Sequence, residues 1–201
     1  MRNWYWLAAL CFVIACSEEK TDLSGNTPLK INDFNKVFKT VTLPINISDT
    51  NLAKVRDTIK IGAKALAQFV PDSVVEKIIP EKDQKAILYP LLKIEKETEY
   101  YLMLNVHHPK KEEIVVVVFS KKNAYLDYKI ITQFLVEQKG SRNYGKSVSI
   151  NREPTFLVEE NKMDEENVLI YEKNGWAFTE NHFRLIYFDS NKKPESKTII
   201  N

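Results

Sequence analysis

In the second half of the chain, apolar residues alternate with polar ones, and this period of two is typical of β-strands. The pattern begins near Ala86 and continues to Phe188. At its centre an unbroken apolar run from Ile114 to Phe119 predicts a strand that is covered on both faces. Short polar clusters separate the segments, and loops of this length join antiparallel neighbours. We therefore expect an antiparallel β-meander of about six to eight strands over residues 86–188.

Two further expectations concern how the strands are connected. Asn174-Gly175 is the residue pair favoured in a two-residue type I′ hairpin, because both central positions of that turn need a positive φ. The spacing of the turns also fits about two blades of a β-propeller, although the chain has no repeat of fixed period.

Before the sheet, apolar residues recur every three or four positions. This spacing predicts an amphipathic helix from Asn51 to Phe69, with Gly62 as a weak point. Ser73 followed by Glu76 resembles a capping box, which predicts a second helix that ends near Ile79. The segment before these helices, up to Pro44, is expected to be irregular or a short strand. The chain is therefore expected to be α+β and mostly β, with a helical part at 51–79.

The first sixteen residues follow neither period. A basic start, Met1-Arg2-Asn3, precedes an uncharged apolar run from Trp4 to Ala15, and Cys16 follows the run. The run has about a dozen residues, whereas a helix needs roughly 20 to cross a bilayer. This order indicates an export signal at residues 1–15 rather than a membrane-spanning helix.

Val13-Ile14-Ala15-Cys16 resembles the lipobox of bacterial lipoproteins. The resemblance implies that the signal is removed before Cys16 and that Cys16 then carries acyl chains such as palmitate. Dual acylation is enough for stable anchoring on a membrane. Two alternatives are an ordinary secretory signal with a coincidental cysteine and an uncleaved anchor helix.

Ser17-Glu18-Glu19-Lys20 resembles the acidic export signal that follows the cysteine in lipoproteins of the Bacteroidetes phylum. This resemblance implies an outer-membrane location, on the periplasmic or the cell-surface side. Leu43-Pro44 and Phe69-Val70-Pro71 resemble segments of uncharacterised outer-membrane lipoproteins of that phylum that have a β-meander domain.

Composition narrows the picture further. Residues 16–32 are polar, which predicts a flexible tether, and residues 33–201 are long enough for a single globular domain. Both cysteines, Cys11 and Cys16, lie near the start of the chain, so the domain has no disulfide. The 29 basic and 27 acidic residues nearly balance, which gives no indication of a nucleic-acid partner.

No catalytic, cofactor or metal site is expected. His107 and His108 are neighbours and should point to opposite faces of a strand, so they cannot easily share a metal ion. There is no Gly-x-Ser-x-Gly motif and no phosphate loop. The acidic clusters fall in predicted turns or at strand ends, where carboxylates are usually solvated. These clusters are Glu112-Glu113, Glu159-Glu160 and Asp164-Glu165-Glu166.

Several aromatic residues lie beside predicted turns or face both sides of a strand. Most are expected to pack in the core, and the alternative is a surface platform for sugars or a protein. The residues are Tyr100, Tyr101, Tyr125, Tyr144, Phe156 and Trp176. In addition, Asp57-Thr58-Ile59 and Asp72-Ser73-Val74 resemble the O-glycosylation motif of exported Bacteroidetes proteins, which implies modification of Thr58 and Ser73.

These observations favour a lipid-anchored envelope protein that binds a protein or glycan partner, or has a structural role, and is not an enzyme. An immunity or inhibitor lipoprotein is one alternative, and it shares the same anchor. A glycan-active hydrolase is the other, and it would need two of the acids between Glu159 and Glu166 to converge in a pocket.

Overall fold

The computed structural model describes residues 21–80 and 85–192. The signal at 1–15 and the lipidation site Cys16 lie outside the described residues. The helical elements are α1 (Ile31–Lys36), α2 (Leu52–Val55), α3 (Ala63–Ala67), α4 (Asp72–Ile78) and the 3-10 helix η1 (Val136–Gln138). The strands are β1 (Ile45–Ser48), β2 (Ile87–Glu95), β3 (Glu99–His107), β4 (Lys111–Ser120), β5 (Tyr125–Leu135), β6 (Tyr144–Ile150), β7 (Thr155–Met163), β8 (Leu169–Thr179) and β9 (His182–Ser190).

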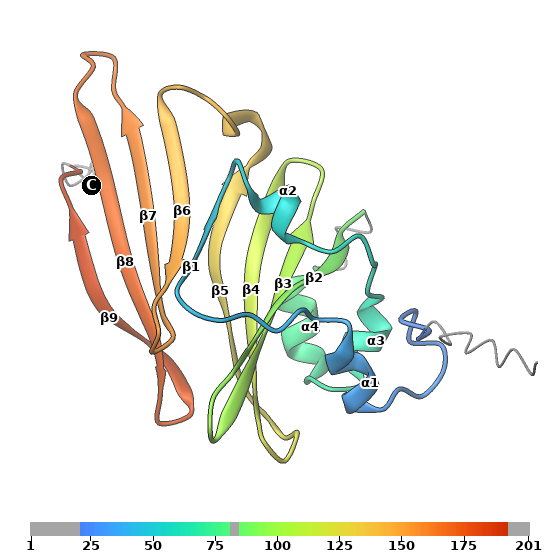
Figure 1. The fold of residues 1–201 in the computed structure, drawn as a ribbon. Helices are drawn as coiled ribbons and strands as arrows, with labels where there is room; N and C mark the ends of the chain where they lie inside the picture. Colours follow the sequence, from blue (N-terminus) through green and yellow to red (C-terminus); the bar gives the residue numbers. More distant parts are fainter. Residues whose placement is uncertain (1–20, 81–84, 193–201) are drawn as a thin grey trace, which may run out of the picture.

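The strands form two antiparallel sheets (Figure 1). Sheet A has the order β2-β3-β4-β5, and sheet B has the order β1-β6-β7-β8-β9. Consecutive strands pair because short turns join them, which confirms the predicted α+β, mainly β meander. The meander changes sheets between β5 and β6, and β1 then pairs with β6. The two sheets share a core, so they are not neighbouring propeller blades.

Sheet A lies between helices α1, α3 and α4 on one side and sheet B on the other, so the molecule has three layers, and α2 packs into the core between the sheets. Strand β4 is completely buried from Ile114 to Phe119, as its unbroken apolar run predicts. Val115 and Val117 face the helices, whereas Ile114 and Val116 face sheet B. Every position in this part of β4 therefore contributes to one of two cores.

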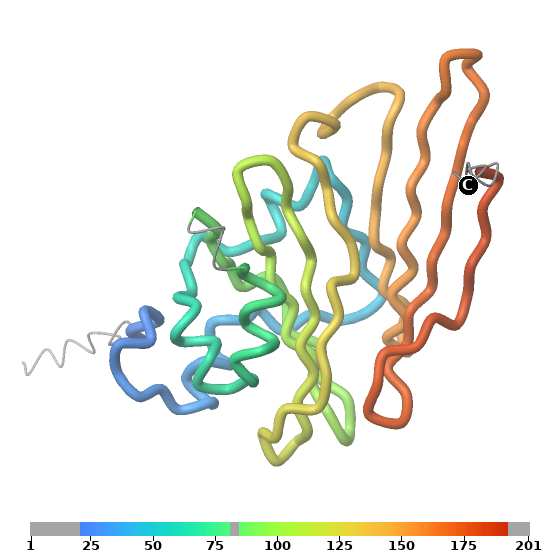
Figure 2. Tube along the Cα trace, turned by 180° about the vertical axis from the view of Figure 1, so that it is seen from behind, coloured from blue at the N-terminus to red at the C-terminus, as the bar shows by residue number. Residues whose placement is uncertain are grey.

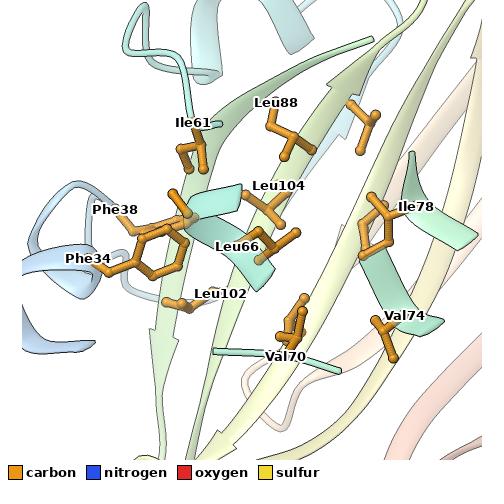
Figure 3. Packing of buried hydrophobic residues seen from close by; sticks show 14 of the residues in the cluster. Phe34, Phe38, Ile61, Leu66, Val70, Val74, Ile78, Leu88, Leu102 and Leu104 are labelled. Atoms are coloured by element: carbon orange, nitrogen blue, oxygen red, sulfur yellow. The ribbon is translucent and has the colours of Figure 1, made fainter. Parts of the chain in front are cut away.

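The core beneath the helices is built from side chains of α1, α3, α4 and sheet A (Figure 3). Phe34 of α1 and Leu66 of α3 are buried against Leu102 and Leu104 of β3. The Phe34 ring also lies 4.8 Å from the ring of Phe69. The helices are too short to be stable alone, so burial of these side chains holds them in place.

The predicted helix from Asn51 to Phe69 is wrong: the region forms two short helices, α2 and α3, joined by an extended segment. Asp57 stops the first, because its carboxylate accepts hydrogen bonds from the amides of Thr58 and Ile59. The predicted capping box is also wrong, since the residue before α4 is Pro71 and no side chain caps that helix.

The predicted turn at Asn174-Gly175 is wrong as well, because both residues lie inside β8. A β-carbon on Gly175 would come within 2.9 Å of the β-carbon of Tyr187, so this glycine allows β9 to approach closely. The two-residue turn is instead at Glu180 and Asn181, whose φ values are 52° and 64°.

Part of the predicted flexible tether, residues 21–30, packs against the helices. Leu23 is buried in the core, and its carbonyl accepts a hydrogen bond of 2.7 Å from the Gly62 amide. The side chain of Gln68 bonds to the amide of Leu29 and to the carbonyls of Gly25 and Thr27. The composition of this segment did not reveal Leu23 and Leu29 as attachment points.

Candidate functional site

Glu112, a buried carboxylate of β4, is in contact with three charged or titratable side chains. The β3–β4 hairpin places His107 directly opposite Glu112. Arg56 reaches the same carboxylate from the segment after α2, and Lys139 reaches it from the loop after η1. With Asn105, which accepts a hydrogen bond from Arg56, these residues form what we call the Glu112 cluster.

The contacts in the Glu112 cluster are short. His107 Nδ1 lies 2.9 Å from Glu112 Oε1, and the Arg56 guanidinium lies 3.4 Å from the same oxygen. The Lys139 ammonium lies 2.8 Å from Oε2, but its direction is not that of a hydrogen bond, so we regard this contact as an ion pair. The guanidinium of Arg56 also stacks on the ring of Tyr89 at 4.6 Å.

The electrostatics of the cluster keep Glu112 ionised. Burial alone would raise the pKa of Glu112, which is only 4 % exposed. The close Lys139 ammonium, the bond to His107 and the charge of Arg56 outweigh burial, so the pKa is lower than its ordinary value. A general acid needs the opposite shift, so the arrangement is suited to joining segments of chain rather than to donating a proton.

Glu113 and His108 lie on the other side of the hairpin. His108 Nε2 is 3.2 Å from Glu113 Oε2, and Lys111 Nζ is 2.6 Å from Glu113 Oε1. The two histidines therefore meet different carboxylates, as their adjacent positions predict. Within residues 21–80 and 85–192, no three acidic, histidine or cysteine side chains are placed to hold a metal ion. The expectation that Glu112 and Glu113 are solvated is wrong, since both are buried.

A second candidate is a cleft of about 230 Å³ where β5 diverges from sheet B. Lys129 of β5 covers the ring of Trp176 at 3.6 Å from its centre. Glu160 and Glu172 are cross-strand neighbours in the cleft, and Lys146 lies 2.9 Å from Glu160.

Both carboxylates of the cleft are paired with lysines, Glu160 with Lys146 and Glu172 with Lys192. The hydrogen bond from Lys192 holds the pKa of Glu172 below its usual range, with a smaller contribution from Asn174. The remaining predicted acids lie elsewhere. Glu159 pairs with Lys173 at 3.0 Å, and Asp164 accepts hydrogen bonds from the amides of Glu166 and Val168 in the β7–β8 turn.

A third candidate is the outer strand of sheet B. Four consecutive large apolar residues of β9, Leu185 to Phe188, are 46–61 % exposed. Residue 186 is the extra residue of a β-bulge, because Leu185 pairs with Trp176 while Tyr187 pairs with Gly175. In the described residues, β9 pairs only with β8, and its other edge is met by β5 near Phe183, whose amide donates a hydrogen bond of 2.8 Å to Asp127.

The aromatic residues singled out from the sequence have mainly packing roles. Tyr100, Tyr101 and Phe156 are buried, and Trp176 is half-buried beneath Lys129. The exposed rings are instead Tyr187 and Phe188 of β9. The apolar run from Leu185 to Phe188 marks this strand in the sequence, but it does not distinguish an exposed strand from a buried one.

Thr58 and Ser73, the predicted O-glycosylation positions, are both exposed. Their modification stays a prediction.

Comparisons of the chain with family models, with curated proteins and with solved structures find no match. Among the described residues, no helix is long and apolar enough to span a membrane.

Proposed function

We propose that the protein is a lipid-anchored protein of the cell envelope, held on the outer membrane by acylated Cys16, and that it binds a protein partner without catalysing a reaction. The observation that supports binding is the exposed apolar run Leu185 to Phe188. Exposed apolar residues of this size are normally scattered, and a contiguous run on an edge strand is typical of an interaction site.

The chemistry of β9 favours an extended segment of another protein. The amide of Phe183 on its outer edge already donates a hydrogen bond to Asp127. Beyond it, from Leu185 to Phe188, no strand of the described residues pairs with this edge, so its backbone groups can take part in strand addition and the apolar side chains beside them provide contact area. A glycan is less favoured, because Lys129 already covers one face of Trp176, the aromatic ring that lines the cleft. No residue pair in the described part of the chain favours the hydrolase alternative.

Replacement of Ile186 with lysine tests this proposal. The lipidated protein is captured from detergent-solubilised envelopes, and the proteins recovered with it are quantified by mass spectrometry. A charge in the middle of β9 is expected to reduce partner recovery at least about tenfold, which corresponds to roughly 1.4 kcal/mol.

The matched control is Val136→Lys, which adds the same charge at an exposed apolar residue of η1. Recovery of the partner should be unchanged in this control. Equal recovery by wild type and Ile186→Lys would contradict the assignment of β9 as the binding surface.

A further inference from the structure

An open groove of about 880 Å³ lies where the chain enters the described structure. It is lined by residues 21–24 and 59–63, together with Ile79, Ala86 and Ile87. Most of its side chains are apolar, and Ile59 at its rim is 42 % exposed. The groove is therefore an apolar surface beside Thr21.

The short connection between Cys16 and Thr21 limits how far the groove can lie from the membrane. Only four residues separate Cys16 from Thr21, so an extended connection between their α-carbons spans at most about 18 Å. Attachment of Leu23 and Leu29 to the domain prevents residues 21–30 from lengthening this connection. A domain of this size is roughly 40 Å across, which is longer than the connection. The domain therefore cannot turn its opposite side to the membrane while Cys16 is anchored there.

The rim of the groove has the chemistry of a membrane-contact surface. Lys60, which follows Ile59 and also lines the groove, is exposed, and a lysine beside apolar residues favours an anionic lipid surface. Two acids, Asp22 and Asp57, lie nearby as well, and local hydrogen bonds hold each of them in place without removing its negative charge. Asp22 accepts bonds from Ser24 and Thr27, and Asp57 accepts bonds from the two amides that follow it.

We propose that the groove face, with Ile59 and Lys60 at its rim, lies on the lipid bilayer. This inference rests on the proposed anchor at Cys16. It places β9 on the side away from the lipid, because the N-terminal segment and β9 lie at opposite ends of the molecule (Figures 1 and 2). The anchor would then present the exposed strand outward.

The membrane contact conflicts with one prediction from the sequence. Thr58 is adjacent to Ile59, so a glycan on Thr58 would hold the rim away from the bilayer. The proposal therefore requires Thr58 to be unmodified, which peptide mass spectrometry of the membrane-derived protein would show. A glycan found on Thr58 would overturn it.

Fluorescence quenching tests the contact directly. Ile59→Cys is expressed as the lipidated protein, labelled with an environment-sensitive fluorophore and reconstituted into vesicles of phosphatidylethanolamine and phosphatidylglycerol that contain nitroxide-labelled lipid. The label is specific, because Cys16 is acylated and Cys11 is removed with the signal. Tyr187→Cys with the same label is the matched control on β9.

We expect quenching at position 59 to be at least about twofold stronger than at position 187. Equal quenching at the two positions would overturn the proposal. A second result would also overturn it: emission of the label at position 59 that indicates an apolar environment but is not quenched by the nitroxide-labelled lipid. The groove would then hold the protein's own acyl chains. Failure of the protein to float with the vesicles would instead contradict the anchor at Cys16.

Discussion

At the scale of single residues, Glu112 shows how a charged side chain becomes part of a core. Its neighbours in the sequence predict a solvated position beside a turn. Arg56 and Lys139 approach it from distant parts of the chain, and their charges compensate for its burial. No periodic pattern reveals such a meeting, because it depends on how α2 and the loop after η1 pack on the sheet.

Replacement of Glu112 with glutamine should destabilise the protein strongly. The substitution leaves Arg56 and Lys139 close together without the carboxylate that compensates them, so we expect a loss of about 3 kcal/mol in the free energy of unfolding at pH 7. Urea unfolding measures this loss. The control Glu95→Gln removes a half-exposed partner of Lys93 and should cost less than about 1 kcal/mol.

The stability of wild type and that of Glu112→Gln should depend differently on pH. The folded state lowers the pKa of Glu112 below its ordinary 4.5, so its ionised form stabilises the fold fully above pH 4.5. This stabilisation is lost as the pH falls through the lower folded pKa. The unfolding curves of wild type and Glu112→Gln should therefore converge under acidic conditions, and a constant difference down to pH 2 would contradict the assignment.

At the scale of elements, the sequence predicts the strands well and the helices poorly. Alternation identifies most strands because successive residues of a strand face opposite sides, and the unbroken apolar run of β4 identifies a strand that is buried on both sides. The spacing of apolar residues from Leu52 to Phe69 suits a helix, but local capping by Asp57 and the packing of Leu23 against Gly62 favour an extended link. The Asn174-Gly175 pair favours a turn, but the close approach of β9 to Gly175 outweighs this preference.

The candidate site could be predicted only in part. The opposite faces of His107 and His108 follow from strand geometry, as confirmed. The exposed run in β9 has the same composition as a buried strand, and exposure depends on which elements cover it. The groove at Thr21 likewise forms from segments that are far apart in the sequence.

Packing of residues 21–30 depends on Gly25, which has a φ of 80°. A β-carbon there would lie 2.2 Å from the backbone nitrogen of Ala65, so Gly25→Ala should detach the segment and cost at least about 1 kcal/mol. Hydrogen exchange of the Gly62 and Leu29 amides should become faster. Gly145→Ala is the control, since a β-carbon at Gly145 meets no atom within 4 Å, and unchanged exchange in Gly25→Ala would refute this dependence.

At the scale of the whole molecule, the proposed anchor and the proposed binding strand lie at opposite ends of three packed layers. Helices α1, α3 and α4 occupy the end where the chain enters, sheet A lies in the middle, and β9 is the outermost strand of sheet B (Figure 1). Under the two proposals, this order of layers would separate contact with lipid from contact with a partner.

The anchor itself is tested by Cys16→Ser. Without acyl chains the protein should move from the membrane fraction to the soluble fraction, because the energy of burying the methylene groups in the bilayer is lost. Immunoblotting of fractionated cells measures the distribution. Cys11→Ser should leave it unchanged, and a Cys16→Ser protein that stays in the membrane fraction would disprove lipid anchoring.

The attachment of residues 21–30 also determines how the molecule responds to mechanical load. A force between Cys16 and a partner on β9 would load the few hydrogen bonds made by Gly62 and Gln68, whereas β9 is held to β8 by a ladder of eight residue pairs with one bulge. The segment should peel away before any strand separates. Its ten residues would lengthen the connection by up to about 35 Å, so the tether can extend under tension while both sheets stay folded.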